Sequence, residues 1–261
     1  MLFMNMLLHD NDHLRSPFIS IIIPTFQEEK ILDRCLSVFT PDLKHKFGIE
    51  IIVSDGGSTD RTVEIAEPYA DSIVIFKGKG KQGIAQGRNS GEEVAKGEIL
   101  IFLNGDTVIT QPDHFLSYVV SWGKGELQTS PSPALACRVD VFPEEKIWHD
   151  RVFYTLHNQY VRMLNAIGMG MCRGECQIIK RQAFRSLGGY HSHLVSGEDF
   201  ELYTRLSKLG RISYVHSLVV IESPRRFRAQ GYLYTLFIWT VDSLSVLFFD
   251  RSVSKEWKDI R

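Results

Sequence analysis

The sequence predicts an α/β protein in which a mostly parallel sheet is flanked by helices. From Ser20 onward, short β-branched runs alternate with helical stretches, which is typical of parallel strands covered by helices. The 261 residues are 44% hydrophobic and 23% charged, close to the average for folded globular proteins. This composition excludes a collagen-like or largely disordered chain, and we expect one compact domain with a C-terminal amphipathic helical appendage.

The first half of the chain is expected to contain four strands separated by three helices. Ile31, Leu32, Cys35 and Leu36 lie at helical spacing and mark one apolar face, and Ser58 opens a run that caps the second helix. We expect strands at 21–23, 50–53, 71–76 and 98–103 and helices at 31–36, 58–66 and 84–95. The loops after these strands meet at one edge of the sheet, where open α/β sheets bind ligands.

The second half is less regular. We expect one or two strands within 127–142, further strands at 174–179 and 212–221, and helices at 144–167 and 198–209. The aromatic side chains of the long helix are expected in the core: Trp148, Phe153, Tyr154 and Tyr160. The expected organisation is an N-terminal arm at 1–17, a main domain at 18–225 and a helical segment at 226–261.

Charge and cysteine content exclude several classes of protein. The 30 Lys and Arg residues nearly balance 31 Asp and Glu, so no basic field is available for nonspecific nucleic-acid binding, and we expect no nucleic-acid partner. Four scattered cysteines do not form a disulfide scaffold or a zinc motif. The apolar start lacks a basic region and a cleavage site, so a secretory signal is not expected and the predicted location is the cytoplasm.

The strongest local signal is the segment from Asn104 to Thr107, which directly follows a buried strand. Asp106 in this segment presents hard oxygen ligands of the kind that bind Mg²⁺ or Mn²⁺, and such a cation neutralises a diphosphate leaving group. The alternative interpretation is an ordinary Asn-Gly-Asp turn.

Two further motifs fall at the same predicted edge. Asp55 precedes two glycines at a strand end, where backbone can approach a flat ligand and the carboxylate can accept a hydrogen bond from a base or ribose. Arg88, on the helix that follows the third strand, adds a cation facing this edge. The alternative for Arg88 is a solvated charge on a helix surface.

Glu198 and Asp199 begin a predicted helix farther along the chain. A carboxylate held near an acceptor hydroxyl can act as the general base that makes the hydroxyl a nucleophile. The alternative is that both acids only favour the positive end of the helix dipole.

Five segments in this order resemble family 2 glycosyltransferases of the GT-A, Rossmann-like fold. They are SIIIPTFQEE at 20–29, EIIVSDGGSTD at 50–60, GRNSG at 87–91, LNGDT at 103–107 and GEDFE at 197–201. The resemblance covers about 20–221, and the order of the five segments is more specific than any one of them.

The resemblance implies an inverting enzyme that transfers a sugar from a nucleotide-diphosphate sugar with help from Mg²⁺ or Mn²⁺. By the match of motifs, Asp106 is the metal ligand and Asp199 the catalytic base, with Glu198 beside it. The nucleotide pocket matches Pro24, Thr25, Phe26, Glu28, Asp55, Arg88 and Asn104.

Two departures from the family pattern concern polar contacts. Asn104 replaces the first acid of the Asp-x-Asp signature, and a neutral amide is a poorer partner for a divalent cation or a ribose hydroxyl. The paired acids after the second strand are here Asp55 and Gly56, so one polar contact to the nucleotide is lost or replaced.

Arg225 and Arg226 follow the last predicted strand. The planar fork of arginine suits diphosphate recognition, so both are candidates for contacts with a pyrophosphate or an acceptor phosphate. A basic surface or juxtamembrane patch is the alternative.

The segment 232–249 is apolar with a single formal charge, Asp242. A helix here carries a polar stripe through Thr235 and Asp242 and a broad apolar face, flanked by basic residues. Spanning a membrane is disfavoured by Asp242. A helix lying on the inner face of the cell membrane, packing on the domain and pairing with a second copy all stay open.

The sequence therefore predicts transfer of a sugar to a hydroxyl or lipid-phosphate acceptor. A lipid phosphate already carries charge and needs no base, in which case Asp199 orients groups instead. A sugar nucleotidyltransferase and a catalytically silent nucleotide-binding scaffold are the alternatives. The sugar, the base, the acceptor and the oligomeric state are not specified by these motifs.

Overall fold

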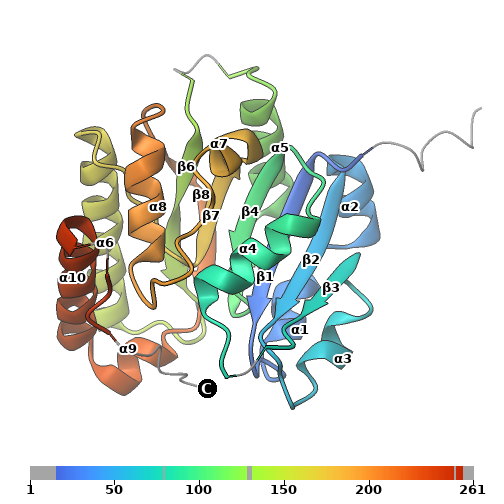
Figure 1. Ribbon diagram of the computed structural model, residues 1–261, viewed down its shortest axis with the longest axis horizontal. Coiled ribbons are helices and arrows are strands. Elements are labelled where there is room, and N and C mark those ends of the chain that lie inside the picture. Colours follow the sequence, from blue (N-terminus) through green and yellow to red (C-terminus); the bar gives the residue numbers. More distant parts are fainter. Residues whose placement is uncertain (1–15, 79, 128–130, 250, 255–261) are drawn as a thin grey trace, which may run out of the picture.

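The computed structural model describes residues 16–78, 80–127, 131–249 and 251–254. Its centre is an eight-stranded sheet in the order β3-β2-β1-β4-β7-β6-β8-β5 (Figure 1). Helices cover both faces of this sheet. The α/β class expected from the sequence is confirmed.

The first half of the chain forms a parallel unit. Ile19 at the start of β1 pairs with Ile49 of β2 on one side and Ile99 of β4 on the other. The four expected strands are all present: β1 (Ile19–Thr25), β2 (Ile49–Asp55), β3 (Ser72–Ile75) and β4 (Ile99–Leu103). The three expected helices are α1 (Leu32–Leu36), α3 (Thr62–Ala66) and α4 (Ile84–Val94).

The second half adds strands of both directions. β7 (Cys176–Lys180) runs antiparallel to β4 and to β6 (Ala134–Val141). β8 (Ser213–Glu222) runs parallel to β6, and β5 (Thr107–Ile109) closes the edge antiparallel to β8. The sheet is therefore parallel from β3 to β4 and mixed beyond it. The helices here are α6 (Trp148–Ala166), α8 (Glu198–Ser207) and α10 (Tyr232–Phe249).

Apolar side chains fill the space on each face of the sheet. Along β1, Ile21 and Ile23 pack into one core cluster and Ile22 into the other, as the two-residue repeat of a strand requires. All three side chains are fully buried. This double burial explains why Ile21 to Ile23 of β1 and the whole of β4 are continuous apolar runs.

Several short elements were not expected from the sequence. They are α2 (Pro41–Phe47), α5 (Pro112–Gly123), α7 (Arg181–Ser186), α9 (Arg225–Gln230) and β5. The segment 127–142 contributes one strand, β6, which begins after the prolines. The prediction that the aromatic residues of α6 are core is wrong for Trp148 and Tyr160, which are 68% and 45% exposed. Tyr160 borders the cavity described below.

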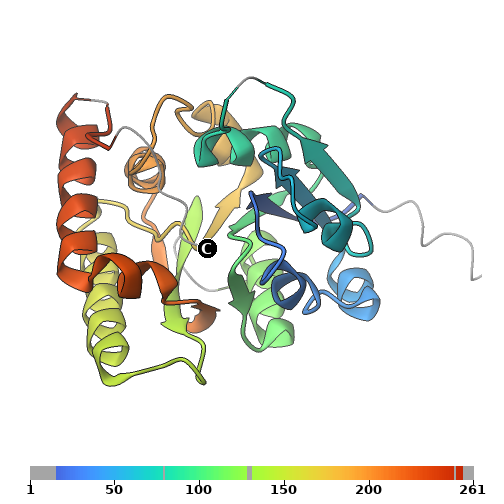
Figure 2. The same cartoon turned by 90° about the horizontal axis from the view of Figure 1, so that it is seen from below.

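Helix α10 buries its polar side chains and exposes its apolar ones, the reverse of a surface helix in an ordinary globular protein. Its buried residues are Thr235, Asp242, Ser245 and Val246, whereas Leu233 and Phe248 are 84% and 71% exposed. Asp242 accepts hydrogen bonds from the backbone of Val253 and Ser254 and from the Ser254 hydroxyl. The predicted polar stripe therefore faces the protein, and the apolar face points outward. The helix itself lies beside α6 (Figure 2).

Candidate active site

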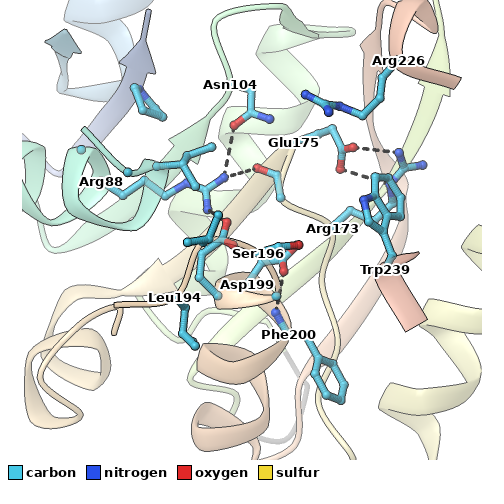
Figure 3. Close-up of a pocket in the computed structure, with 18 of the residues that line it drawn as sticks. Arg88, Asn104, Arg173, Glu175, Leu194, Ser196, Asp199, Phe200, Arg226 and Trp239 are labelled. Carbon is cyan, nitrogen blue, oxygen red and sulfur yellow. Dashed lines mark hydrogen bonds and ion pairs between the residues drawn. The ribbon is translucent and has the colours of Figure 1, made fainter. Parts of the chain in front are cut away.

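A cavity of about 610 Å³ lies at the carboxyl ends of β1, β2 and β4. Its walls come from the loops after these strands, from the N-terminal part of α8, and from α9 and α10. Figure 3 shows side chains from these elements converging on the cavity. The structure thus brings motifs from the whole length of the chain to one place, as the sheet topology predicts.

The loop after β1 forms one wall. Pro24, Thr25, Phe26 and Glu28 all line the cavity, as does Gly56 from the loop after β2. A Cβ atom at Gly56 would lie 3.4 Å from the Phe26 ring, so glycine allows the two loops to approach closely. Gln27 fastens them together, since its amide donates to Thr59 and its backbone N–H donates to the Ser58 hydroxyl.

Asp55 is the one predicted nucleotide residue that the structure does not bring to the cavity wall. It is fully buried, and Oδ2 accepts from the backbone of Gly57 and Ser58. Oδ1 accepts from the hydroxyls of Thr25 and Ser58. These bonds use the carboxylate to hold its own glycine turn, and its contact with a base stays a prediction.

Arg88 of α4 lines the cavity and connects α8, the turn after β4 and the loop before β7. It is 1% exposed and donates to Glu198 at 2.7 Å, to Asn104 at 3.2 Å and to the Gly174 carbonyl at 2.8 Å. The alternative of a solvated surface charge is therefore wrong. Asn104, which replaces an acid of the family signature, uses its amide oxygen as the acceptor for this buried cation.

Asp199 stands at the first turn of α8, half-buried beside Glu198. Burial, followed by the neighbouring charge of Glu198, raises the pKa of Asp199 to about 7. A Cβ atom at Gly174 would lie 3.3 Å from Asp199 Oδ2, so this glycine leaves room for the carboxylate. A carboxyl group with a pKa near neutrality is suited to exchange a proton with a substrate hydroxyl.

Asp106 lies in the turn after β4 and is paired with Arg225 at 2.9 Å. The same guanidinium contacts Glu28 at 3.0 Å, so one arginine bridges acids from two loops. Within the described ranges, no three His, Cys, Asp or Glu residues are grouped to hold a metal unaided. One or two carboxylates suffice where diphosphate oxygens complete the coordination of Mg²⁺ or Mn²⁺, and the Asp106 carboxylate fits that arrangement.

A second charged cluster borders the cavity and was not predicted. Arg173 forms two hydrogen bonds with Glu175, at 3.1 and 2.8 Å, and one with Glu222 at 2.5 Å. Tyr154 donates to Glu222 at 2.7 Å, and Arg226 lines the cavity nearby. Burial, followed by Glu175, raises the pKa of Glu222, whereas burial lowers the pKa of Arg226.

Sequence reasoning missed this cluster because Glu175 lay in a predicted strand and Tyr154 in a predicted core helix, while Arg173 and Glu222 lay just outside predicted strands. The only signal was the Arg-Gly-Glu triplet at 173–175 immediately before a buried strand. Glycine there leaves Arg173 and Glu175 on the same side as Asp199.

Comparison with known proteins identifies the chain. The sequence profile described as Glycosyl transferase family 2 matches residues 20–188. The chain belongs to this family. This glycosyltransferase is 39% identical over 227 residues to the glycosyltransferase AglE of Haloferax volcanii, covering 81% of the chain and 68% of AglE. It is 27% identical over 146 residues to validoxylamine A glucosyltransferase of Streptomyces hygroscopicus subsp. limoneus, covering 50% of the chain and 32% of that enzyme.

Solved structures confirm that this glycosyltransferase has the GT-A fold. The mannosyltransferase PcManGT from Pyrobaculum calidifontis, in complex with GDP-Man and Mn²⁺, superposes with a TM-score of 0.65 at 21% identity. That match covers 88% of this chain and 63% of PcManGT. S. aureus TarS 1-349, in complex with UDP-GlcNAc, gives a TM-score of 0.56 at 18% identity, covering 78% and 57% of the two chains.

Proposed function

We propose that this glycosyltransferase transfers a sugar, with inversion, from a nucleotide-diphosphate sugar to an acceptor held beside Asp199. The observation that carries the proposal is the common cavity of Asp106, Arg225 and Asp199. This arrangement provides positive charge for a leaving diphosphate and a base for the nucleophile in one enclosed space. The related structures bound to GDP-Man or UDP-GlcNAc support a nucleotide-sugar donor.

In the proposed reaction the acceptor oxygen forms a bond to the anomeric carbon while the bond from that carbon to the diphosphate breaks. For a hydroxyl acceptor, the proton passes to a carboxylate oxygen of Asp199. Glu198 acts by positioning, because its pairing with Arg88 fixes the start of α8 on which Asp199 stands. Holding the reactants in this geometry lowers the entropic part of the barrier.

Asp106 is the proposed ligand for Mg²⁺ or Mn²⁺, which when bound would neutralise charge on the leaving diphosphate. Arg225 would then exchange its contact with Asp106 for the diphosphate oxygens, since its guanidinium already lies within reach of this carboxylate. Pro24, Thr25, Phe26 and Glu28 form the proposed wall around the nucleoside.

We further propose that the protein binds at the inner face of the cell membrane through α6 and α10. Helix α10 is long and apolar enough to span a bilayer by composition, yet its buried Asp242 faces the protein. Leu156 of α6, Ile167 directly after α6 and Phe237 of α10 are each more than 60% exposed. Exposed arginines accompany this apolar face and suit anionic headgroups: Arg151, Arg162, Arg228 and Arg251.

The deciding experiment is calorimetry of the purified protein with UDP, GDP, CDP and dTDP, each with and without Mn²⁺. We expect one base to be preferred and its affinity to rise with metal. Asp106→Asn should abolish the gain from metal, whereas Asp113→Asn, at an exposed surface pair with Lys46, should retain it. Failure of every nucleotide to bind, or release of pyrophosphate during turnover, would contradict the proposal.

A further inference from the structure

The cavity continues past the proposed reaction centre into an apolar groove. Beyond Asp199 its lining changes to side chains of α6, of the loop before β7 and of α10. Six apolar residues define this groove: Leu164, Met171, Leu236, Trp239, Leu244 and Leu247. No sugar or nucleotide requires so much apolar surface, so the groove is available for another part of a substrate.

The outer wall of the groove is open to the surroundings. Leu236, Leu244 and Leu247 are 39%, 50% and 43% exposed although they line the cavity. They belong to the outward apolar face of α10, whose polar residues are turned inward. The groove therefore joins the reaction centre to the face that we propose lies on a membrane.

The buried guanidinium of Arg173 lines the cavity and has one nitrogen without a hydrogen-bond partner. Arg173 is 4% exposed, and its Nη1 atom has no hydrogen-bond partner although the other two nitrogens are bound to Glu175 and Glu222. Arg173 shares the cavity with Trp239 of α10 and with Arg226, and Figure 3 shows these side chains around it. An arginine nitrogen left over in a buried position is suited to a phosphate oxygen.

We infer that the acceptor is a phosphate carried on a long apolar chain, with the chain in the groove and the phosphate at Arg173 and Arg226. The inference rests on the proposed glycosyl transfer and names the acceptor class for it. Gly174 links the two sites directly, because it adjoins Arg173 in sequence and Asp199 in space. Either a phosphate oxygen or a hydroxyl attached beyond the phosphate then reaches the donor sugar.

The test compares chain length and head group in binding. Dodecyl phosphate, propyl phosphate and dodecyl glucoside are titrated below their micelle concentrations, each with bromine on the second carbon of its alkyl chain to quench Trp239 fluorescence. We expect dodecyl phosphate to bind at least tenfold more tightly than either of the other two. The quenching should disappear in Trp239→Phe. Equal affinity for dodecyl and propyl phosphate would overturn the inference.

Two neighbouring residues of α10 provide a matched pair. Leu247 lines the groove, whereas Phe248 is 71% exposed and does not line it. Leu247→Gln should reduce the advantage of dodecyl over propyl phosphate at least fivefold, and Phe248→Gln should leave it unchanged. If both variants lose this advantage equally, the dodecyl chain binds to the outer face of α10 and not in the groove, and the inference is overturned.

The two proposals fail differently. Release of nucleoside diphosphate is followed in parallel with binding. A donor that is neither bound nor consumed contradicts the proposed transfer, while the chain-length dependence of binding still decides the groove. A donor that is consumed equally fast with propyl and dodecyl phosphate contradicts the acceptor class alone. The donor sugar is isotopically labelled to identify the nucleophile. Label transferred to dodecyl phosphate identifies a phosphate oxygen as the nucleophile. If label is transferred only to a lipid phosphate that already bears a sugar, the nucleophile is a hydroxyl of that sugar.

Discussion

The raised pKa of Asp199 suits it to proton transfer but lowers the stability of the folded protein at neutral and higher pH. A carboxyl in water ionises near pH 4, and burial with Glu198 alongside moves the pKa of Asp199 to about 7. Between these values the folded protein holds a proton that the unfolded chain has released. Raising the pH through this window therefore lowers the free energy of unfolding.

Asp199→Asn should consequently stabilise the protein while inactivating it. At pH 8 we expect a higher melting temperature than wild type, and near pH 3.5 no difference, because both side chains are then uncharged. Sugar transfer to a hydroxyl acceptor should fall on the order of 10²-fold or more, and in the wild type it should rise with pH up to about 7. Thermal unfolding and product formation across pH measure both effects, with Asp113→Asn as the control. An unchanged melting temperature at pH 8 would contradict the raised pKa.

The Arg88–Glu198 pair supports a second prediction at this scale. Arg88→Met leaves Glu198 buried without its partner, and such losses cost about 3–5 kcal/mol. Urea denaturation should show this loss, and Arg88→Met with Glu198→Gln should lose less than the sum of the single variants. Arg61→Met, in the exposed pair with Glu64, should have no measurable effect. Strict additivity of the two buried substitutions would show that the pair is not coupled.

At the scale of elements, α10 should decide attachment to membranes. Leu233→Glu with Phe237→Glu places two charges on its outward face, where both side chains are more than 60% exposed. We expect binding to vesicles of mixed neutral and anionic lipid to fall at least tenfold while the melting temperature stays the same. Co-sedimentation measures this binding. Ile75→Glu, on strand β3 at the opposite edge of the sheet, is the control. Vesicle binding that survives the double substitution would refute this role of the helix.

The elements differ in how far the sequence could predict them. The strands β1 and β2 each contain three consecutive apolar residues, β4 is apolar throughout, and nearly all residues of the three strands are buried. By contrast β5 has three residues and α7 six, too few to show a period. The exposed aromatic residues of α6 resembled core because the sequence records their hydrophobicity and not the side from which the helix is covered.

The residues of the candidate site also differ in how far the sequence could predict them. Asp106 and Asp199 belong to segments with recognisable spacing, and both line the cavity as expected. Arg173 and Trp239 line one cavity although they come from distant parts of the chain, and no local sequence pattern specifies that arrangement. Asp55 belongs to a recognisable motif, yet its carboxylate bonds to its own glycine turn and does not line the cavity.

At the scale of the whole molecule, the C-terminal segment is part of the main body. Ser252 accepts hydrogen bonds from the backbone of Val195 and Ser196 and donates to the Ser196 carbonyl, just before α8. Buried Phe227 of α9 packs into the main core. The segment after residue 225 therefore packs as part of the main domain, and residue 225 is not a structural boundary.

A chain ended at residue 225 should accordingly lose its cooperative unfolding transition and most of its solubility. The truncation removes one wall of the cavity and the hydrogen bonds that hold the loop before Asp199. Circular dichroism during heating and gel filtration test this expectation. A truncated protein that melts like the full chain would show that 226–261 is a separable appendage.

The antiparallel pairing of β5 with β8 has a consequence for how the protein is made. Thr107 pairs with Glu222, so the edge of the sheet is completed by residues that leave the ribosome long after β5 itself. The parallel strands β1 to β4 all pair within the first half and can assemble during synthesis. Until β8 arrives, β5 lacks its strand partner, and Arg225, which pairs with Asp106, has not yet been synthesised. The proposed donor site is therefore completed only late in synthesis.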